Sequence, residues 1–378
     1  MNFITVSQKS NRADGGEADK GSDKMSASAI LQYSAVITKM RAMYTGILKR
    51  SDYEKLMSMT RVGDVVRWLK ESRGYGTALE DVSDTSVHRN ILESAFDNAL
   101  IEDANKLKHM LGNDGKRMLT VLMSRIEIMM LKRILRAIYT GIPAPSRAFY
   151  RLYAPKTYSS NKHLDPYKCI RAKDFHQLID VLRGSGYDKV LEPYVMGEIT
   201  STFDMEEALD EYYFKVVLES AEKYLTKEDY NITKNFFGTE ADIQNIIWIY
   251  RYKKYYDFTE EEILGHILPD RRKLRKEQIR SLSAAGVDDF QSAVSETRYR
   301  WLFAGDDVQW ESEAADYLCK MYMSQIRHNK YSFAAIVAYL FLKEIDIQNI
   351  ITIVEGVRYG MEPQQIEQYL ILGDHNGH

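Results

Sequence analysis

The sequence predicts an all-α protein, and three observations lead to that prediction. Proline is scarce, with seven residues in 378 against a usual share of about 5%. Because a proline inside a helix costs about 3 kcal/mol, the proline-free stretches 1–142 and 194–268 suit long helices. From residue 26 onward the apolar residues recur at helical spacing, and no run alternates with the period of two that a strand requires.

The elements follow in order along the chain. Residues 7–24 are rich in Ser, Gly, Asp and Lys, so residues 1–27 are predicted to be a disordered leader, with Met1 and Met25 as alternative start sites. Helices are expected over 30–48, 53–59, 62–69, 91–111 and 116–140, the last two joined by a turn at 112–115. An irregular stretch, 141–170, holds four of the seven prolines. Helices are predicted again over 175–182, 205–225, 241–256, 260–268, 271–284, 312–327, 331–343 and 346–354.

The composition excludes several classes of function. The chain carries 51 Lys and Arg against 54 Asp and Glu, a net charge of −3, which gives no field to attract nucleic acid. Two cysteines, Cys169 and Cys319, cannot form a disulfide framework and fit a reducing cytoplasm. The longest apolar stretch, 333–342, rises about 15 Å as a helix, half of a ~30 Å bilayer core, so no membrane span is predicted. The eight histidines show no metal-ligand spacing, and no nucleotide-binding motif occurs, so neither metal nor cofactor is expected.

A short pattern containing a tyrosine occurs three times. It reads Leu182-Arg-Gly-Ser-Gly-Tyr187 and Val294-Ser-Glu-Thr-Arg-Tyr299, and an earlier copy with one extra residue ends at Tyr75. The three tyrosines are 112 residues apart in both steps. This spacing indicates an internal repeat.

A second pattern supports the repeat. Asp242-Ile-Gln-Asn245-Ile-Ile matches Asp346-Ile-Gln-Asn349-Ile-Ile over six residues, and a degraded copy begins at Glu127. Repeats of about 112 residues are three similar helical domains and not a solenoid. Their predicted bounds are 28–145, 146–262 and 263–372, followed by a tail at 373–378.

The repeated residues have a structural and a functional interpretation. Asp and Asn three residues apart share one face of a helix and could form a polar site. Triplication favours architecture instead, with the acids capping or cross-linking helices, and Thr239 with Asp242 resembles a capping box. For Tyr75, Tyr187 and Tyr299 we expect buried rings whose hydroxyls are tied to a neighbouring helix.

One basic cluster, 270–280, is the candidate interface. As a helix it would present four cations outward: Arg271, Arg272, Arg275 and Lys276. A solvated face is the first interpretation, and a docking patch for an acidic partner is the second. Nucleic acid is the weakest, because the net charge is near zero and no aromatic residues are interleaved.

Taken together, the triplicated repeat, the Leu-x-x-Ser/Thr-x-Tyr pattern and the Asp-Ile-x-Asn-Ile motif resemble the C subunit of the bacterial and archaeal V/A-type ATPases, akin to the d subunit of the vacuolar enzyme. The segment 33–48 resembles the opening helix of that family, and the resemblance covers residues 28–372. Two departures are Met130 in place of the expected Asn in the first repeat and Glu355 in place of Arg in the third.

The resemblance implies a funnel of three helical domains around a pseudo-threefold axis. Such subunits bind no nucleotide and catalyse nothing alone. They lie on the cytoplasmic side of the membrane between the rotor shaft and the proteolipid ring, and they couple rotation to proton or sodium transport. The alternatives are an unrelated helical scaffold and an enzyme with a tyrosine-rich pocket. The resemblance leaves open whether the complex makes or hydrolyses ATP.

Overall fold

The computed structural model describes residues 32–84, 87–141, 164–197, 199, 201–256, 258–268, 272–303, 310–328 and 331–373. Every regular element within these ranges is a helix, so the predicted all-α class is confirmed. Among the described residues, no helix combines the length and the apolar character needed to cross a bilayer. The predicted leader, most of the proline-rich stretch and the end of the predicted tail lie outside the described residues.

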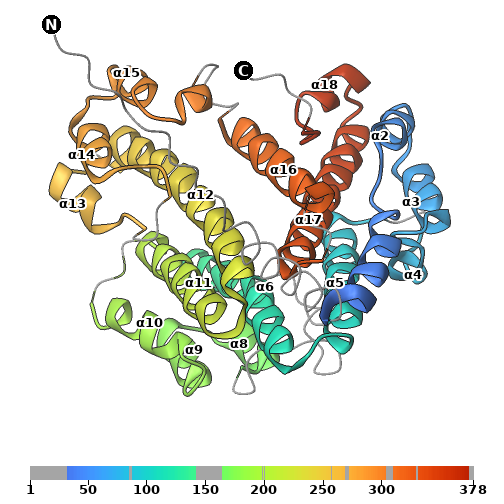
Figure 1. Cartoon of the computed structure of the whole chain (residues 1–378), viewed down its shortest axis with the longest axis horizontal. Coiled ribbons are helices and arrows are strands. Elements are labelled where there is room, and N and C mark those ends of the chain that lie inside the picture. The colour runs from blue at the N-terminus through green and yellow to red at the C-terminus, as the bar shows by residue number, and fades with distance from the viewer. Residues whose placement is uncertain are drawn as a thin grey trace, which may run out of the picture.

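Three pairs of long helices form the body of the molecule. Figure 1 shows the pairs meeting near the middle of the molecule and the shorter helices arranged around them. The first pair is α5 (Arg89–His109) and α6 (Asn113–Thr140), the second is α11 (Phe203–Tyr224) and α12 (Lys227–Arg251), and the third is α16 (Trp310–His328) and α17 (Phe333–Arg358). The two helices of each pair pack against each other. In addition, α6 packs on α11, and α5 packs on α17.

Groups of short helices precede each long pair. The first group follows a helical segment over 32–44 and consists of α2 (Arg50–Met57), α3 (Val62–Glu71) and α4 (Gly76–Leu79). The second is α8 (Pro166–Arg171), α9 (Phe175–Leu182) and α10 (Tyr187–Val195). The third is α13 (Glu260–Gly265), α14 (Lys276–Ala284), α15 (Phe290–Ser295) and a 3₁₀ turn over Arg300–Phe303. The last helix of the described residues is α18 (Pro363–Glu367).

Capping residues set several of these boundaries. Asp165 accepts hydrogen bonds from the backbone of Tyr167 and Lys168, and proline occupies the first position of α8, where its missing N–H costs nothing. Thr259 and Glu262 form a reciprocal capping box at the start of α13.

Two helices are longer than the sequence predicts. The stretches 331–343 and 346–354 form one helix, α17, because the charged residues between them do not interrupt the backbone hydrogen bonds. α12 begins at Lys227, with Thr226 as its N-cap, and not at 241. Thr239 therefore lies inside α12, where its hydroxyl donates to the carbonyl of Asn235, so the predicted capping box at Thr239 and Asp242 is wrong.

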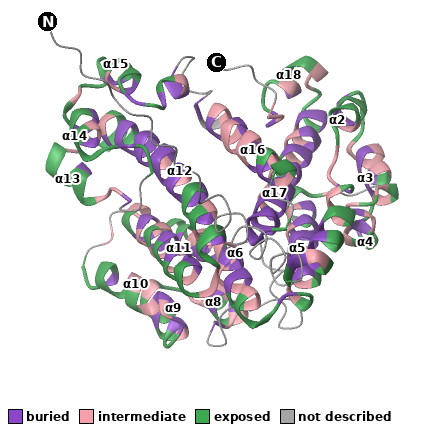
Figure 2. Cartoon of the chain, viewed as in Figure 1, coloured by how far each residue is buried: buried purple, intermediate pink, exposed green. Residues whose placement is uncertain are grey.

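The hydrophobic core lies mainly along the long helices. Figure 2 shows the buried residues concentrated on them and the exposed residues on the outer short helices. The longest apolar stretch of the sequence is the first half of α17, where every residue from Phe333 to Leu340 is buried. The stretch thus belongs to a central core helix.

Candidate functional site: the charged hollow between the repeated helices

The acid of each repeated motif accepts a hydrogen bond from one of the repeated tyrosines. The hydroxyl of Tyr187 donates to Oε2 of Glu127 (2.9 Å), that of Tyr299 to Oδ2 of Asp242 (2.7 Å), and that of Tyr75 to Oδ2 of Asp346 (2.6 Å). In the first two pairs the tyrosine follows its acid along the chain. In the third it comes from the opposite end of the chain. The pairing is therefore circular, and the last long helix is tied to the first short helices.

Asp346 shows how a carboxylate is accommodated in the core. It is buried and accepts hydrogen bonds from the hydroxyls of Tyr53 (2.7 Å) and Tyr75 (2.6 Å) and from the backbone N–H of Leu48 (3.1 Å). Burial raises the pKa of Asp346, while Lys343 and the two tyrosines act in the opposite direction. The Lys343 ammonium lies 3.4 Å from the centre of the Tyr75 ring, and burial lowers its pKa to about 8.

Asp242 is held mainly by backbone donors. The N–H groups of Arg272, Lys273 and Leu274 donate to its carboxylate at 2.7–3.2 Å, beside the bond from Tyr299. Unpaired carboxylates are expensive to bury, so four donors explain why an acid can occupy this position.

The predicted basic interface lies next to this carboxylate. Arg271 is outside the described residues. Arg272 is exposed, and its guanidinium donates to the Thr239 hydroxyl (3.1 Å). Arg275 and Lys276 are exposed at the start of α14. The helix predicted over 271–284 thus begins only at Lys276, because the preceding backbone N–H groups bind Asp242 instead. The docking role of these cations stays a prediction.

The two repeated asparagines hydrogen-bond to the backbone of the segment that follows each motif helix. Asn245 donates to the carbonyl of Leu268 (3.1 Å) and accepts from its N–H (2.8 Å). Asn349 does the same with Ile371 at 2.8 Å in both directions. Both amides are buried, so each satisfies two backbone groups that would otherwise lack partners. In the first repeat Met130 takes this position and is also buried.

A charged residue occurs two positions before each motif acid, and the three charges meet. Nη1 of Arg125 in α6 lies 3.0 Å from Oε1 of Glu240 in α12, and its Nε lies 3.9 Å from Oε1 of Glu344 in α17. Burial disfavours the charged form of Arg125, but the carboxylates of Glu240 and Glu344 outweigh it and raise its pKa. The three equivalent helices therefore meet at equivalent positions.

A second layer lies one helical turn earlier. The residues five positions before the motif acids are Leu122, Phe237 and Phe341. The rings of Phe237 and Phe341 are 6.1 Å apart, and the hydroxyl of Tyr213 in α11 donates to the carbonyl of Leu122 (3.2 Å). The Arg125 guanidinium lies 5.2 Å from the centre of the Phe341 ring, which connects the two layers.

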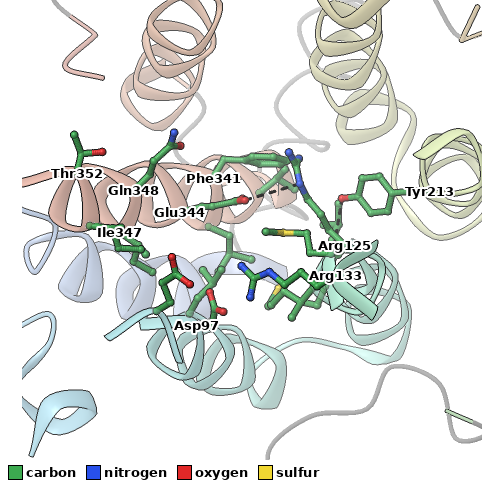
Figure 3. Close-up of a pocket in the computed structure, with 18 of the residues that line it drawn as sticks. Asp97, Arg125, Arg133, Tyr213, Phe341, Glu344, Ile347, Gln348 and Thr352 are labelled. Atoms are coloured by element: carbon green, nitrogen blue, oxygen red, sulfur yellow. Dashed lines mark hydrogen bonds and ion pairs between the residues drawn. The ribbon is translucent and has the colours of Figure 1, made fainter. Parts of the chain in front are cut away.

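A hollow opens beside this meeting point. It has a volume of about 350 Å³ and lies among α5, α6, α11 and α17, with apolar walls that include Leu100, Ile126 and Val337. Figure 3 shows that Arg125, Phe341 and Glu344 lie together and that Asp97 and Arg133 lie along the same hollow. The charged lining is mixed in sign, with Arg89, Arg125 and Arg133 among the cations and Glu93, Asp97 and Glu344 among the acids.

Asp97 is the most perturbed carboxyl of the hollow. Burial raises its pKa to about 7, opposed by Arg133 and reinforced by Glu344 and Glu93. A hollow with apolar walls and charges of both signs is suited to holding a protein segment or helix end.

Sequence reasoning missed this meeting point. Arg125, Glu240 and Glu344 share an offset of two residues from the motif acids, so aligning the three motif copies would have revealed them. Their distances could not be inferred, because helical spacing does not say which helices touch.

Comparison with known proteins identifies the family. The family model of the ATP synthase (C/AC39) subunit matches residues 36–369, nearly the whole chain. The chain belongs to this family.

Relatives in the family agree in length. The chain is 21% identical over 350 residues to the C subunit of the A-type ATP synthase of Archaeoglobus fulgidus, a match that covers 90% of this chain and 96% of the relative. It is 23% identical over 363 residues to the protein of the same name in Methanococcoides burtonii, covering 93% and 98%. The match to the Methanosarcina barkeri protein of that name is 22% over 348 residues, covering 90% and 93%. The family predicted from the repeated motifs is thereby confirmed.

Proposed function

We propose that the chain is the non-catalytic C subunit of a bacterial or archaeal V/A-type rotary ATPase. In this role it is an adaptor on the central stalk that couples the soluble rotor shaft to the membrane proteolipid ring, and so to proton or sodium transport. The observation that carries the proposal is the family match across nearly the whole chain, with relatives named as C subunits of A-type ATP synthases. The match also disfavours the alternative of an unrelated helical scaffold.

The fold suits a part that transmits torque. A torque adaptor must resist deformation, and a closed arrangement of packed helices resists it better than an open array does. The bond between Tyr75 and Asp346 joins the two ends of the chain, and the contact of Arg125 with Glu240 and Glu344 joins three long helices. The described residues would therefore turn as one body.

We propose further that the hollow receives the end of the central stalk. Its apolar walls can bury the apolar side of an inserted segment, while its paired charges can hydrogen-bond to the polar side. The outer polar surface would then contact the cytoplasmic loops of the ring from the inner face of the cell membrane.

The hollow can be blocked without disturbing the core. Gln348 lines it and is exposed, so Gln348→Trp adds an indole there without removing a buried contact. The matched control is Gln364→Trp, which makes the same change at an exposed position of α18. We expect Gln348→Trp to weaken co-purification with the stalk subunits at least tenfold and the control to leave it unchanged. Equal binding by both variants would rule out insertion of the stalk at this site.

The basic segment can be tested separately. Arg275→Glu with Lys276→Glu reverses two exposed cations while leaving the backbone donors to Asp242 in place. Lys189→Glu with Lys215→Glu is the control, with the same change of charge on exposed positions of α10 and α11. The first pair should weaken reassembly with the rotor or ring at low salt more than the second does. Unchanged reassembly would remove the segment from the interface.

A further inference from the structure

A separate cluster of ligand-type side chains lies where α11 begins and α13 ends. Asp204 and Glu207 come from the first turns of α11, and His266 directly follows α13. One donor atom from each residue lies within 4.8 Å of the others. We propose that these three residues form a binding site for one divalent transition-metal ion of the Zn²⁺ class.

The environment of Glu207 is the first argument for an ion. The residue is only 8% exposed, and its Oε1 accepts a hydrogen bond from the hydroxyl of Tyr252. Its other oxygen, Oε2, is buried and faces Nδ1 of His266 at 2.8 Å, an ion pair when the imidazole is protonated. With a neutral imidazole, the same two atoms are the lone-pair donors that an ion bound by the cluster would share. A buried carboxylate oxygen needs one partner or the other, because an unpaired one is costly.

The local charge is the second argument. Asp204, Asp210 and Glu211 surround Glu207 with negative charge, and the nearby cation Lys132 is paired with Asp210 at 2.5 Å. A divalent ion bound among the three side chains would offset the negative charge of both Glu207 and Asp204.

The donor set selects the kind of ion. One imidazole nitrogen with two carboxylate oxygens suits Zn²⁺ and its first-row neighbours, whereas Mg²⁺ and Ca²⁺ favour oxygen ligands alone. Water would complete the coordination, since Asp204 is exposed and the site opens to solvent.

The aromatic surroundings fix the histidine and the glutamate. The His266 ring packs against the rings of Tyr252 and Phe258, with centroid separations of 5.5 and 5.6 Å. The Tyr252 hydroxyl holds the far oxygen of Glu207, as outer hydrogen bonds orient the ligands of metal sites. An ion bound here would connect α11 to the turn after α13. His266 lies in this turn, two residues before Leu268, whose backbone carbonyl accepts a hydrogen bond from Asn245.

The test uses the full chain, stripped of metal with a chelator. Isothermal titration with ZnCl₂ should show one site per chain and a higher thermal midpoint of unfolding. His266→Ala and Glu207→Gln should each weaken Zn²⁺ binding at least about tenfold, and Tyr252→Phe should weaken it less. Glu207→Gln keeps the size and shape of the side chain and removes its charge, so the variant should still fold while losing the Zn²⁺-dependent increase in the thermal midpoint.

His328→Ala is the matched control. It removes an exposed histidine at the end of α16, far along the chain from the cluster, and should bind Zn²⁺ like the wild type. The proposal is overturned if the wild-type chain does not bind Zn²⁺ at micromolar concentrations. It is equally overturned if His266→Ala and Glu207→Gln both retain wild-type affinity, since the ion would then bind elsewhere. Neither result bears on stalk or ring binding, so the proposed function is tested independently.

Discussion

The circular pairing of tyrosines and acids predicts that one hydroxyl near the start of the chain stabilises its end. Tyr75→Phe removes the bond to Oδ2 of Asp346 and keeps the ring, which is buried and packs edge-on against Phe96. A hydrogen bond to a charged group contributes about 1.5–3 kcal/mol. Because Tyr53 and the N–H of Leu48 still bind Asp346, we expect the lower part of that range, about 1.5 kcal/mol.

The double variant Tyr53→Phe/Tyr75→Phe should cost more than the sum of the two single variants. The first loss leaves the carboxylate with other donors, whereas the second leaves a buried charge with only one of the three hydrogen bonds that the native residue accepts. Groups in one hydrogen-bond network couple by about 0.5–3 kcal/mol. We therefore expect a total of about 4 kcal/mol or more. Tyr369→Phe, at a tyrosine that is 57% exposed, is the control and should change stability by less than about 0.5 kcal/mol.

Urea unfolding gives the free energies, and hydrogen exchange measured by mass spectrometry gives their location. In Tyr75→Phe, amide protection should fall both in α2–α4 and in the second half of α17, because the bond joins them. Loss of protection confined to α2–α4, or a cost below about 0.5 kcal/mol, would show that the polar contact does not hold the two ends together.

Three further predictions concern the other polar contacts. Asn349→Leu removes both hydrogen bonds to the Ile371 backbone, so we expect a loss of about 2–4 kcal/mol and faster proteolysis near the C-terminus. The pKa of Asp97 is raised to about 7, so the folded state keeps a proton that the unfolded chain loses near pH 4. The contribution of this proton to the free energy of unfolding is complete below about pH 4 and is lost as the pH rises through about 7. Asp97→Asn should therefore gain stability over the wild type between about pH 5 and pH 8. Unfolding experiments should show a gain of at most about 4 kcal/mol. Arg125→Met leaves the carboxylate of Glu240 unpaired and should cost about 1–2 kcal/mol, since Arg125 is partly exposed in the hollow, and adding Glu240→Gln should recover part of that loss in the same assay.

The helical class and the family were accessible from the sequence because each rests on local residue patterns. Scarce proline and helical spacing indicate single helices, and a repeat is recognised by comparing segments of the sequence with one another. The partner of each tyrosine was not accessible. All three bonds between tyrosines and acids cross the predicted repeat boundaries, as with Tyr187 and Glu127 on either side of residue 145. Sequence spacing identifies equivalent residues but does not say which copy contacts which.

Helix ends were the other weak point. The sequence predicts a start at 241 for α12 and a capping box at Thr239 and Asp242, yet both residues lie inside the helix. The Thr239 hydroxyl donates to the Asn235 carbonyl within α12 and accepts from Arg272, and Asp242 binds the segment before α14, so neither side chain caps the helix. A cap pattern is ambiguous wherever long-range partners satisfy the same polar atoms.

The meeting of Arg125, Glu240 and Glu344 shows what a triplicated chain can do that a symmetric trimer cannot. In a trimer of identical protomers, the position two residues before the motif acid would place three identical side chains at the axis. Three glutamates would repel one another, and three arginines would do so equally. Once the copies are fused in one chain, each can change independently. One copy can then supply the cation that pairs with the carboxylates of the other two, just as the first repeat has a buried Met130 where the others have asparagine.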